Sequence, residues 1–243
     1  MYFNNMLSPE NKIQKKNGVL ILFSGGMDSV AAAVLLSLRF PRVRLLTCTP
    51  PYVLGCRALT SSRVMSLQQA IPQVVISQVF ADNYPLLRLL RPLEAVKGAK
   101  SSLIFCTACK ISMHLKAIEV CRREGLRYAS SGIGVREQQN FPDQLPDLES
   151  RVNRLYEEAG IRRISPLEGR SKAEVKELLT DYALFPRFMF PRCPFKQIQE
   201  LFWFFFGFPA DEKTLDWYDS RLPLLKRIIS EMQDAGCGMR DAG

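Results

Sequence analysis

The sequence has little histidine, little tryptophan and no long apolar run. Among its 243 residues there are one histidine and two tryptophans. The single histidine, His114, leaves little room for Ser-His-Asp or Cys-His catalysis. The longest apolar stretches, near Val19–Phe23 and Leu201–Phe206, are far shorter than the ~20 residues that a membrane span needs. Met1–Lys16 has no apolar segment of the kind found in a secretory signal. We therefore expect a cytoplasmic protein with no membrane partner.

Two common phosphate-binding motifs, Gly-x-x-x-x-Gly-Lys-Ser/Thr and Gly-x-Gly-x-x-Gly, are absent as well. The composition is that of an average globular protein, with 47% hydrophobic and 23% charged residues, which excludes disordered and fibrous classes. The 33 Lys+Arg exceed the 24 Asp+Glu, and the formal net charge of +9 favours an anionic partner such as nucleic acid or nucleotide phosphates. Seven cysteines without a secretory signal indicate thiols, metal ligands or catalysis rather than a disulfide scaffold.

Apolar runs of strand length alternate with helical patterns along most of the chain. This alternation predicts an α/β fold with a parallel sheet and helices on both faces. The expected strands are 18–23, 43–49, 74–80, 128–133 and 162–165. The expected helices are 30–39, 57–71, 84–96, 107–124 and 171–183, with two more at 195–206 and 214–233. We divide the chain into a flexible lead-in (1–17), a core domain (18–190), a small C-terminal helical region (191–236) and a tail (237–243).

The sharpest motif, Ser24-Gly-Gly-Met-Asp-Ser29, stands between the first predicted strand and the first predicted helix. Its two glycines let the backbone turn tightly and approach an anion, and the N–H groups at the helix start can bind phosphate. The serine hydroxyls add donors, whereas Asp28 repels phosphate and would hold Mg²⁺ on it. The structural alternative is a glycine-rich turn in which Ser29 only caps the helix.

Phe23-Ser-Gly-Gly-Met-Asp-Ser29 resembles the PP-loop of the ATP pyrophosphatases, a superfamily that includes GMP synthetases, tRNA thiolases and 7-cyano-7-deazaguanine synthases. The resemblance covers about 18–185 and implies a HUP-type, Rossmann-like domain. It also implies that ATP is cleaved to AMP and pyrophosphate, that a substrate oxygen is adenylated, and that a nucleophile displaces AMP. Asp28 would then be catalytic. The nucleotide-binding residues that the resemblance implies are Ser24, Gly25, Gly26, Met27, Asp28, Ser29, Thr47, Cys48 and Gly132.

Three cysteines form a second candidate motif. Cys106-Thr-Ala-Cys109 stands where a loop is expected to enter the helix 107–124. At a helix start, both sulfurs lie on one side of the first turn, where the helix dipole stabilises thiolates. Cys193, between two prolines, adds a third thiol. Three thiolates suit a 4Fe–4S cluster with one open iron, or a zinc site with a fourth ligand. A redox pair or a coincidence stay open.

This arrangement is similar to that of PP-loop tRNA thiolases that hold a three-cysteine 4Fe–4S cluster. The resemblance implies Cys106, Cys109 and Cys193 as metal ligands, with Cys106 and Cys193 as catalytic residues. It implies ATP-dependent insertion of sulfur, taken from a sulfur donor, into a tRNA base. Four alternatives stay open: a persulfide pair, sulfur insertion into a small molecule in cofactor biosynthesis, an amide- or nitrile-forming ligase with zinc, and a binding module without catalysis.

Five further residues are candidates for contacting the substrate. Lys110 follows the C-x-x-C and either faces the site or is an exposed helix lysine. Arg136 and Gln138 follow the fourth predicted strand, at the end of the sheet where such folds bind ligands, or belong to a solvated loop. Arg187 and Arg192 stand among phenylalanines, a mixture that suits an unstacked nucleotide or ordinary packing.

Other conspicuous residues are expected in the protein interior. His114 lies beside the apolar stripe of its predicted helix and is expected to be a partly buried, hydrogen-bonded residue. Cys121 falls on that stripe and is expected in the core. Cys48 ends a buried strand and is a core residue or a neighbour of the nucleotide. The run Leu201–Phe206 is apolar all round and is buried or forms a homodimer contact.

Overall fold

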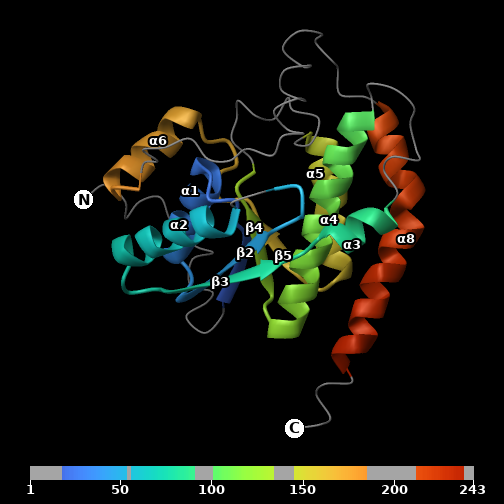
Figure 1. Ribbon diagram of the computed structural model, residues 1–243, viewed down its shortest axis with the longest axis horizontal. Helices are drawn as coiled ribbons and strands as arrows, with labels where there is room; N and C mark the ends of the chain where they lie inside the picture. Colours follow the sequence, from blue (N-terminus) through green and yellow to red (C-terminus); the bar gives the residue numbers. More distant parts are fainter. Residues whose placement is uncertain (1–17, 54–55, 91–100, 134–144, 185–211, 238–243) are drawn as a thin grey trace.

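A five-stranded parallel sheet forms the centre of the described part of the chain (Figure 1). The structure, a computed structural model, describes residues 18–53, 56–90, 101–133, 145–184 and 212–237. The strand order is β3-β2-β1-β4-β5, and all neighbouring strands run parallel. The predicted α/β fold is confirmed. The strands are β1 (Gly18–Leu22), β2 (Arg42–Cys48), β3 (Val75–Ala81), β4 (Tyr128–Ser131) and β5 (Arg162–Ile164).

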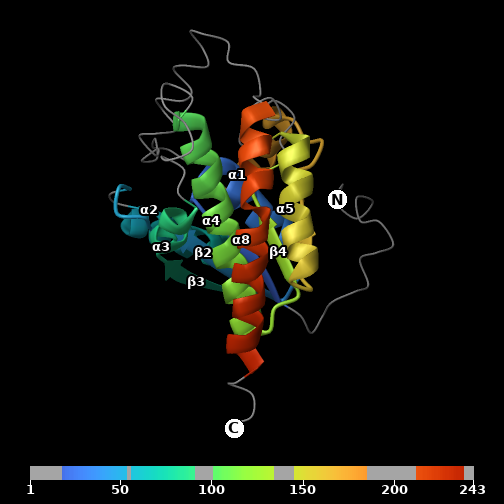
Figure 2. The ribbon, with the colours of Figure 1, turned by 90° about the vertical axis from the view of Figure 1, so that its right-hand side faces the viewer.

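Helices cover both faces of this sheet, and Figures 1 and 2 show the two layers from perpendicular directions. One layer contains α1, α2 and α6, and the other contains α3, α4, α5 and α8. The bounds are α1 (Met27–Ser37), α2 (Cys56–Ala70), α3 (Tyr84–Leu89), α4 (Ser101–Glu124), α5 (Pro146–Glu158), α6 (Lys172–Asp181) and α8 (Glu212–Cys237).

The central strand β1 explains why two helix layers are needed. Successive side chains of a strand point to opposite faces, so an apolar run without polar residues must be covered on both sides. Val19 and Ile21 pack into the core under α1, α2 and α6, whereas Leu20 packs into the core under α4, α5 and α8. All three are fully buried. This strand therefore places the turn that follows it between two packed layers.

Helix α5 was not predicted from the sequence, although its pattern is clearly amphipathic. Its buried side chains, Leu148, Val152, Leu155 and Tyr156, recur at helical spacing, and Pro146 occupies the first turn, where its missing N–H costs nothing. The acidic residues Asp147 and Glu149 in that turn also favour a helix start. The helix could have been recognised from these signals.

Helices α4 and α8 also differ from the predicted bounds. Helix α4 begins at Ser101 rather than at 107, and α8 continues to Cys237, beyond the predicted end at 233. The described part of the predicted helix 84–96 ends as α3 at Leu89. The predicted helix 195–206 lies outside the described residues, as does the lead-in 1–17.

The C-terminal helix α8 lies along α4 and α5 and shares their core. Trp217, Tyr218 and Ile229 are buried there. The Tyr218 hydroxyl donates to the Arg151 carbonyl oxygen at 3.2 Å, and the Arg122 guanidinium donates to the Ile229 carbonyl oxygen. Helix α8 therefore completes the layer that holds α4 in place.

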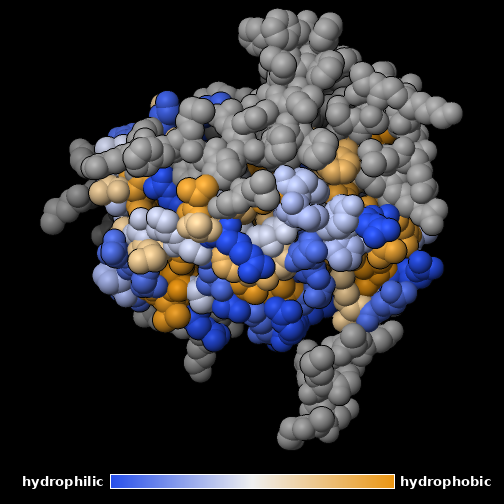
Figure 3. All heavy atoms as spheres, viewed as in Figure 1, coloured by the Kyte–Doolittle hydropathy of each residue, from blue (hydrophilic) through white to orange (hydrophobic). Residues whose placement is uncertain are grey.

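The described helices include none that is long and apolar enough to cross a membrane. On the face drawn in Figure 3, hydrophilic side chains alternate with smaller apolar areas over the described residues.

His114 joins α4 to α5 inside the second layer. Its side chain is 1% exposed, and its Nδ1 lies 2.9 Å from the Tyr156 hydroxyl oxygen. Burial lowers the pKa of His114 well below its ordinary value, and the nearby cations Arg163 and Lys110 lower it further. The residue is therefore a neutral, buried core residue, more deeply buried than the sequence predicted.

We expect the free energy of unfolding to fall as the pH drops below about 6.5, the pKa of a histidine in the unfolded chain. His114 then binds a proton in the unfolded chain but not in the folded protein. The free energy of unfolding should therefore change with pH with a slope that approaches about 1.4 kcal/mol per pH unit between about pH 6 and 5. Urea unfolding at several pH values measures this slope. Because the sequence contains no other histidine, His114→Gln should flatten it, and an equal slope in that variant would contradict the assignment.

Candidate active site

The turn between β1 and α1 is closed by its own serines and a glycine. The Ser24 and Ser29 hydroxyl oxygens lie 3.2 Å apart, and the Ser29 hydroxyl donates to the Gly26 carbonyl oxygen at 3.0 Å. Gly25 has φ 75°, a left-handed conformation that glycine adopts without strain. Gly26 is the N-cap of α1 and brings no side chain to cap the first N–H groups. These N–H groups are therefore suited to an external anion.

Gly132, which follows β4, lies directly against this turn. A Cβ added to Gly132 would lie 2.6 Å from the Ser29 nitrogen and 2.8 Å from the Asp28 carbonyl carbon. Real Cβ atoms do not come so close to backbone atoms, so only glycine fits here. The carboxyl ends of β1 and β4 thus meet at the start of α1, which is the part of a parallel sheet where ligands bind.

The end of β2 supports the turn from the other side. Thr47 is 1% exposed, and its hydroxyl donates to the Phe23 carbonyl oxygen at 2.9 Å. The Gln78 side-chain amide donates to that hydroxyl at 2.9 Å, so the Thr47 side chain is bonded within the protein. Cys48 is half-buried, and burial raises the pKa of its thiol to about 12, with smaller effects from neighbours including Cys109. Its thiol is therefore neutral at pH 7.

The two cysteines of the C-x-x-C are half-buried one turn apart on α4. Because α4 begins at Ser101, Cys106 and Cys109 lie inside the helix and not at its start, contrary to the prediction. The stabilisation of thiolates by the helix dipole is weak there, since it falls off within the first turn. The Cys109 sulfur instead lies 3.1 Å from the Tyr52 hydroxyl oxygen and 3.9 Å from the Asn83 amide nitrogen.

Cys106 and Cys109 present two thiols on one helix to a metal that prefers sulfur ligands. Two thiols one helical turn apart, one of them with hydrogen-bonding neighbours, are suitable donors for iron or zinc. Among the residues that the structure describes, no three His, Cys, Asp or Glu side chains group to hold a metal ion. The predicted third ligand, Cys193, lies outside those residues, as do Arg136, Gln138, Arg187 and Arg192.

Lys110 belongs to a buried ionic network and is not an exposed helix lysine. Its ammonium contacts the Glu149 carboxylate, whose other oxygen lies 2.5 Å from the Arg163 guanidinium. Burial by itself would raise the pKa of Glu149, but Lys110 and Arg163 outweigh that effect and hold the pKa below its ordinary value. Arg163 also donates to the Ser131 hydroxyl at 3.1 Å, next to Gly132.

Sequence reasoning missed Tyr52, Asn83, Glu149 and Arg163. Tyr52 follows β2 and Asn83 follows β3, so their places after parallel strands could have marked them as candidates. Glu149 was missed because the helix that carries it was not predicted. Glu149 contacts Arg163, 14 positions away, and Lys110, 39 positions away, and contacts between residues so far apart leave no pattern in the sequence.

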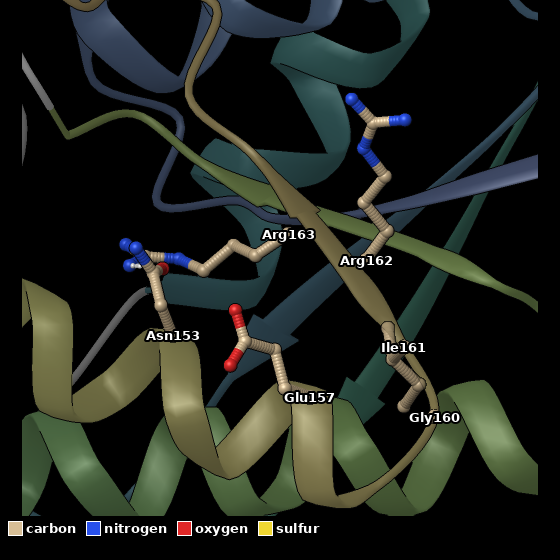
Figure 4. A pocket seen from close by; sticks show the side chains of 6 residues that line it. All are labelled: Asn153, Glu157, Gly160, Ile161, Arg162 and Arg163. Carbon is tan, nitrogen blue, oxygen red and sulfur yellow. Dashed lines mark hydrogen bonds between the residues drawn. The ribbon is translucent and has the colours of Figure 1, made fainter.

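A separate hollow lies where α5 leads into the edge strand β5 (Figure 4). It is lined by Asn153, Glu157, Gly160, Ile161, Arg162 and Arg163. Of the predicted nucleotide, metal and substrate residues that the structure describes, none lines it. Arg163 reaches Asn153 at 2.8 Å, so part of this lining belongs to the ionic network described above.

Comparisons with known proteins place the fold. No family model matches the sequence, and no curated protein matches it. The U34-tRNA thiolase NcsA from Methanococcus maripaludis, solved with its 4Fe–4S cluster, superposes with a TM-score of 0.50 at 15% identity, over 87% of this chain and 73% of that one. NMN synthetase from Francisella tularensis superposes with a TM-score of 0.50 at 15% identity, over 90% of each chain. The chain therefore shares its fold with these two enzymes.

Proposed function

We propose that this protein is an ATP-dependent sulfurtransferase that adenylates its substrate and inserts sulfur, with a tRNA base as the acceptor. The observation that carries the ATP half is the contact of Gly132 with Asp28 and Ser29. It forms a backbone cradle at the start of α1, where N–H groups and the positive end of the helix dipole favour phosphate. The resemblance of the turn to a PP-loop supports pyrophosphate as the group held there.

In this proposal the residues of the turn and of the end of β2 bind different parts of ATP or hold the site in place. The backbone N–H groups of Met27, Asp28 and Ser29 hold the pyrophosphate as it leaves, and the serine hydroxyls orient it. The Asp28 carboxylate holds Mg²⁺, whose charge offsets the repulsion between the carboxylate and the phosphates. Thr47 keeps the end of β1 in place through its bond to Phe23. Cys48 and the end of β2 border the adenine.

The sulfur half of the proposal rests on the thiols of α4. Cys106 and Cys109, with Cys193, would hold a 4Fe–4S cluster, and zinc is the alternative metal. When bound, such a cluster would supply an open iron as a binding site for sulfur. The support is the C-x-x-C on a helix beside the sheet and the fold shared with a tRNA thiolase that contains a 4Fe–4S cluster.

The acceptor is proposed from charge. A formal net charge of +9 favours a polyanion such as tRNA, and Arg136, Gln138, Arg187 and Arg192 are the candidates for contacting it. Lys110 is a weaker candidate because Glu149 already pairs with its ammonium. One observation favours a second function, an amide-forming ATP-dependent ligase with zinc. The superposition on NMN synthetase covers 90% of this chain and 90% of the NMN synthetase chain, whereas the superposition on the thiolase covers 73% of the thiolase chain.

Gly132→Ala should lower ATP-dependent pyrophosphate release by about 100-fold, because a misplacement of about 1 Å in a site has an effect of that size. The new methyl group would force the first turn of α1 away from β4. A phosphate-release assay coupled to a pyrophosphatase measures the rate. Gly160→Ala is the matched control: it has φ 70° and open space around it, so only stability should fall. Pyrophosphate release at the original rate in Gly132→Ala would contradict the cradle.

Asp28→Asn should abolish pyrophosphate release while the chain stays folded. The substitution keeps the side-chain shape and removes the charge that would hold Mg²⁺. The same coupled assay, run over a range of Mg²⁺ concentrations, measures the loss, and circular dichroism checks the fold. Asp181→Asn, on the exposed side of α6, should release pyrophosphate normally. Equal rates in Asp28→Asn and Asp181→Asn would overturn the ATP half of the proposal.

Anaerobic purification followed by iron, sulfide and zinc analysis separates the two functions. We expect iron and sulfide, with both lost in Cys106→Ala and Cys109→Ala, because each thiolate holds one iron. Cys121→Ala, a fully buried cysteine on the same helix, should keep them. Incubation with tRNA, ATP, Mg²⁺ and sulfide should then yield a thiolated nucleoside in mass spectra of the digested tRNA. Zinc without a thiolated product would favour the ligase.

A further inference from the structure

Cys109 is surrounded by polar side chains that come from two other elements of the fold. Tyr52, in the loop after β2, places its hydroxyl oxygen 3.1 Å from the Cys109 sulfur. Asn83, directly before α3, places its amide nitrogen 3.9 Å from the same sulfur. The sulfur is therefore approached from the carboxyl ends of β2 and β3 at once. We refer to Tyr52 and Asn83 as the Cys109 donor pair.

The orientation of Asn83 follows from its other bonds. The Ser112 hydroxyl donates to the Cys109 carbonyl oxygen at 2.7 Å, so its own oxygen is left to accept. The Asn83 amide nitrogen donates to the Ser112 hydroxyl oxygen, also at 2.7 Å. An amide nitrogen carries two hydrogens, and the second is available to the Cys109 sulfur. Asn83 is fully buried, so water does not compete for this hydrogen.

Packing also holds Tyr52 in position. Its ring lies 5.8 Å from the Phe105 ring and 6.4 Å from the Tyr84 ring, measured between centroids. Such tilted and edge-on contacts are the favoured arrangements of aromatic pairs. Phe105 precedes Cys106 on α4, so the aromatic contact ties the Tyr52 ring to the same helix that carries both cysteines. The hydroxyl is thereby directed at one sulfur by contacts that do not involve that sulfur.

We propose that Tyr52 and Asn83 are positioning residues that donate hydrogen bonds to the metal-bound Cys109 sulfur and so set the reduction potential and retention of the metal centre. The proposal rests on the proposed role of Cys109 as a ligand. A metal-bound thiolate has no proton and can only accept, so both neighbours must donate to it. Hydrogen bonds to ligating sulfurs draw off negative charge, which favours the reduced state and raises the potential.

The test compares Tyr52→Phe with Tyr84→Phe in the full chain purified without oxygen. Each change removes one hydroxyl from the same aromatic group, but only Tyr52 contacts the sulfur. Redox titration followed by electron paramagnetic resonance should give a lower potential for Tyr52→Phe and an unchanged one for Tyr84→Phe. Metal release to a chelator should be about tenfold faster or more in Tyr52→Phe, the range typical for the loss of such partners.

The outcomes separate this inference from the proposed function. Iron at the original content, with the original potential and release rate in Tyr52→Phe, would overturn the inference and leave the sulfurtransferase proposal intact. If zinc is bound, the release rate alone decides in the same way. If the chain holds neither metal, the metal part of the proposed function fails and this inference fails with it.

Discussion

The close contact between the backbone after β4 and the first turn of α1 is the constraint on which the candidate site depends. There is no room for a Cβ on Gly132 beside Asp28 and Ser29. The turn therefore cannot move closer to β4, and a larger residue at position 132 would push the turn away. On its other side the turn is held through Phe23, which bonds to Leu46 and Thr47 of β2. The three central strands therefore hold the N–H groups of α1 in place before any ligand binds, which reduces the ordering cost of binding.

The buried ionic network of Lys110, Glu149 and Arg163 also supports the backbone around Gly132. Glu149 on α5 neutralises one of two cations, Lys110 on α4 and Arg163 on β5, and Arg163 bonds onward to Ser131 beside Gly132. A buried ion pair is worth little in net stability, but leaving one member unpaired costs several kcal/mol, so the network imposes a specific arrangement of three elements.

Helix α4 connects the two halves of the proposed chemistry. One face of the helix supplies Ile111, Leu115 and Ile118 to the core shared with α5 and α8, and its second and third turns carry Cys106 and Cys109 near the ends of β2 and β3. The thiols are therefore carried on a helix anchored along much of its length. The Cys109 donor pair adds a second level of control, because residues from two loops contact a sulfur whose helix is already held by packing.

Local patterns in the sequence were enough to predict the parallel sheet and the turn after β1. A continuous apolar strand must be buried on both faces, so the residues of Gly18–Phe23 were enough to predict a central strand. Two glycines before a helix start leave N–H groups for an anion, so the residues of Ser24–Ser29 were enough to predict an anion-binding turn. The helix α5 was missed although its periodicity was present. The start of α4 at Ser101, the pairing of Lys110 with Glu149, and the contacts of Tyr52 and Asn83 with Cys109 were decided only by tertiary structure. These contacts join residues that are distant in the chain, and their geometry depends on how the layers pack.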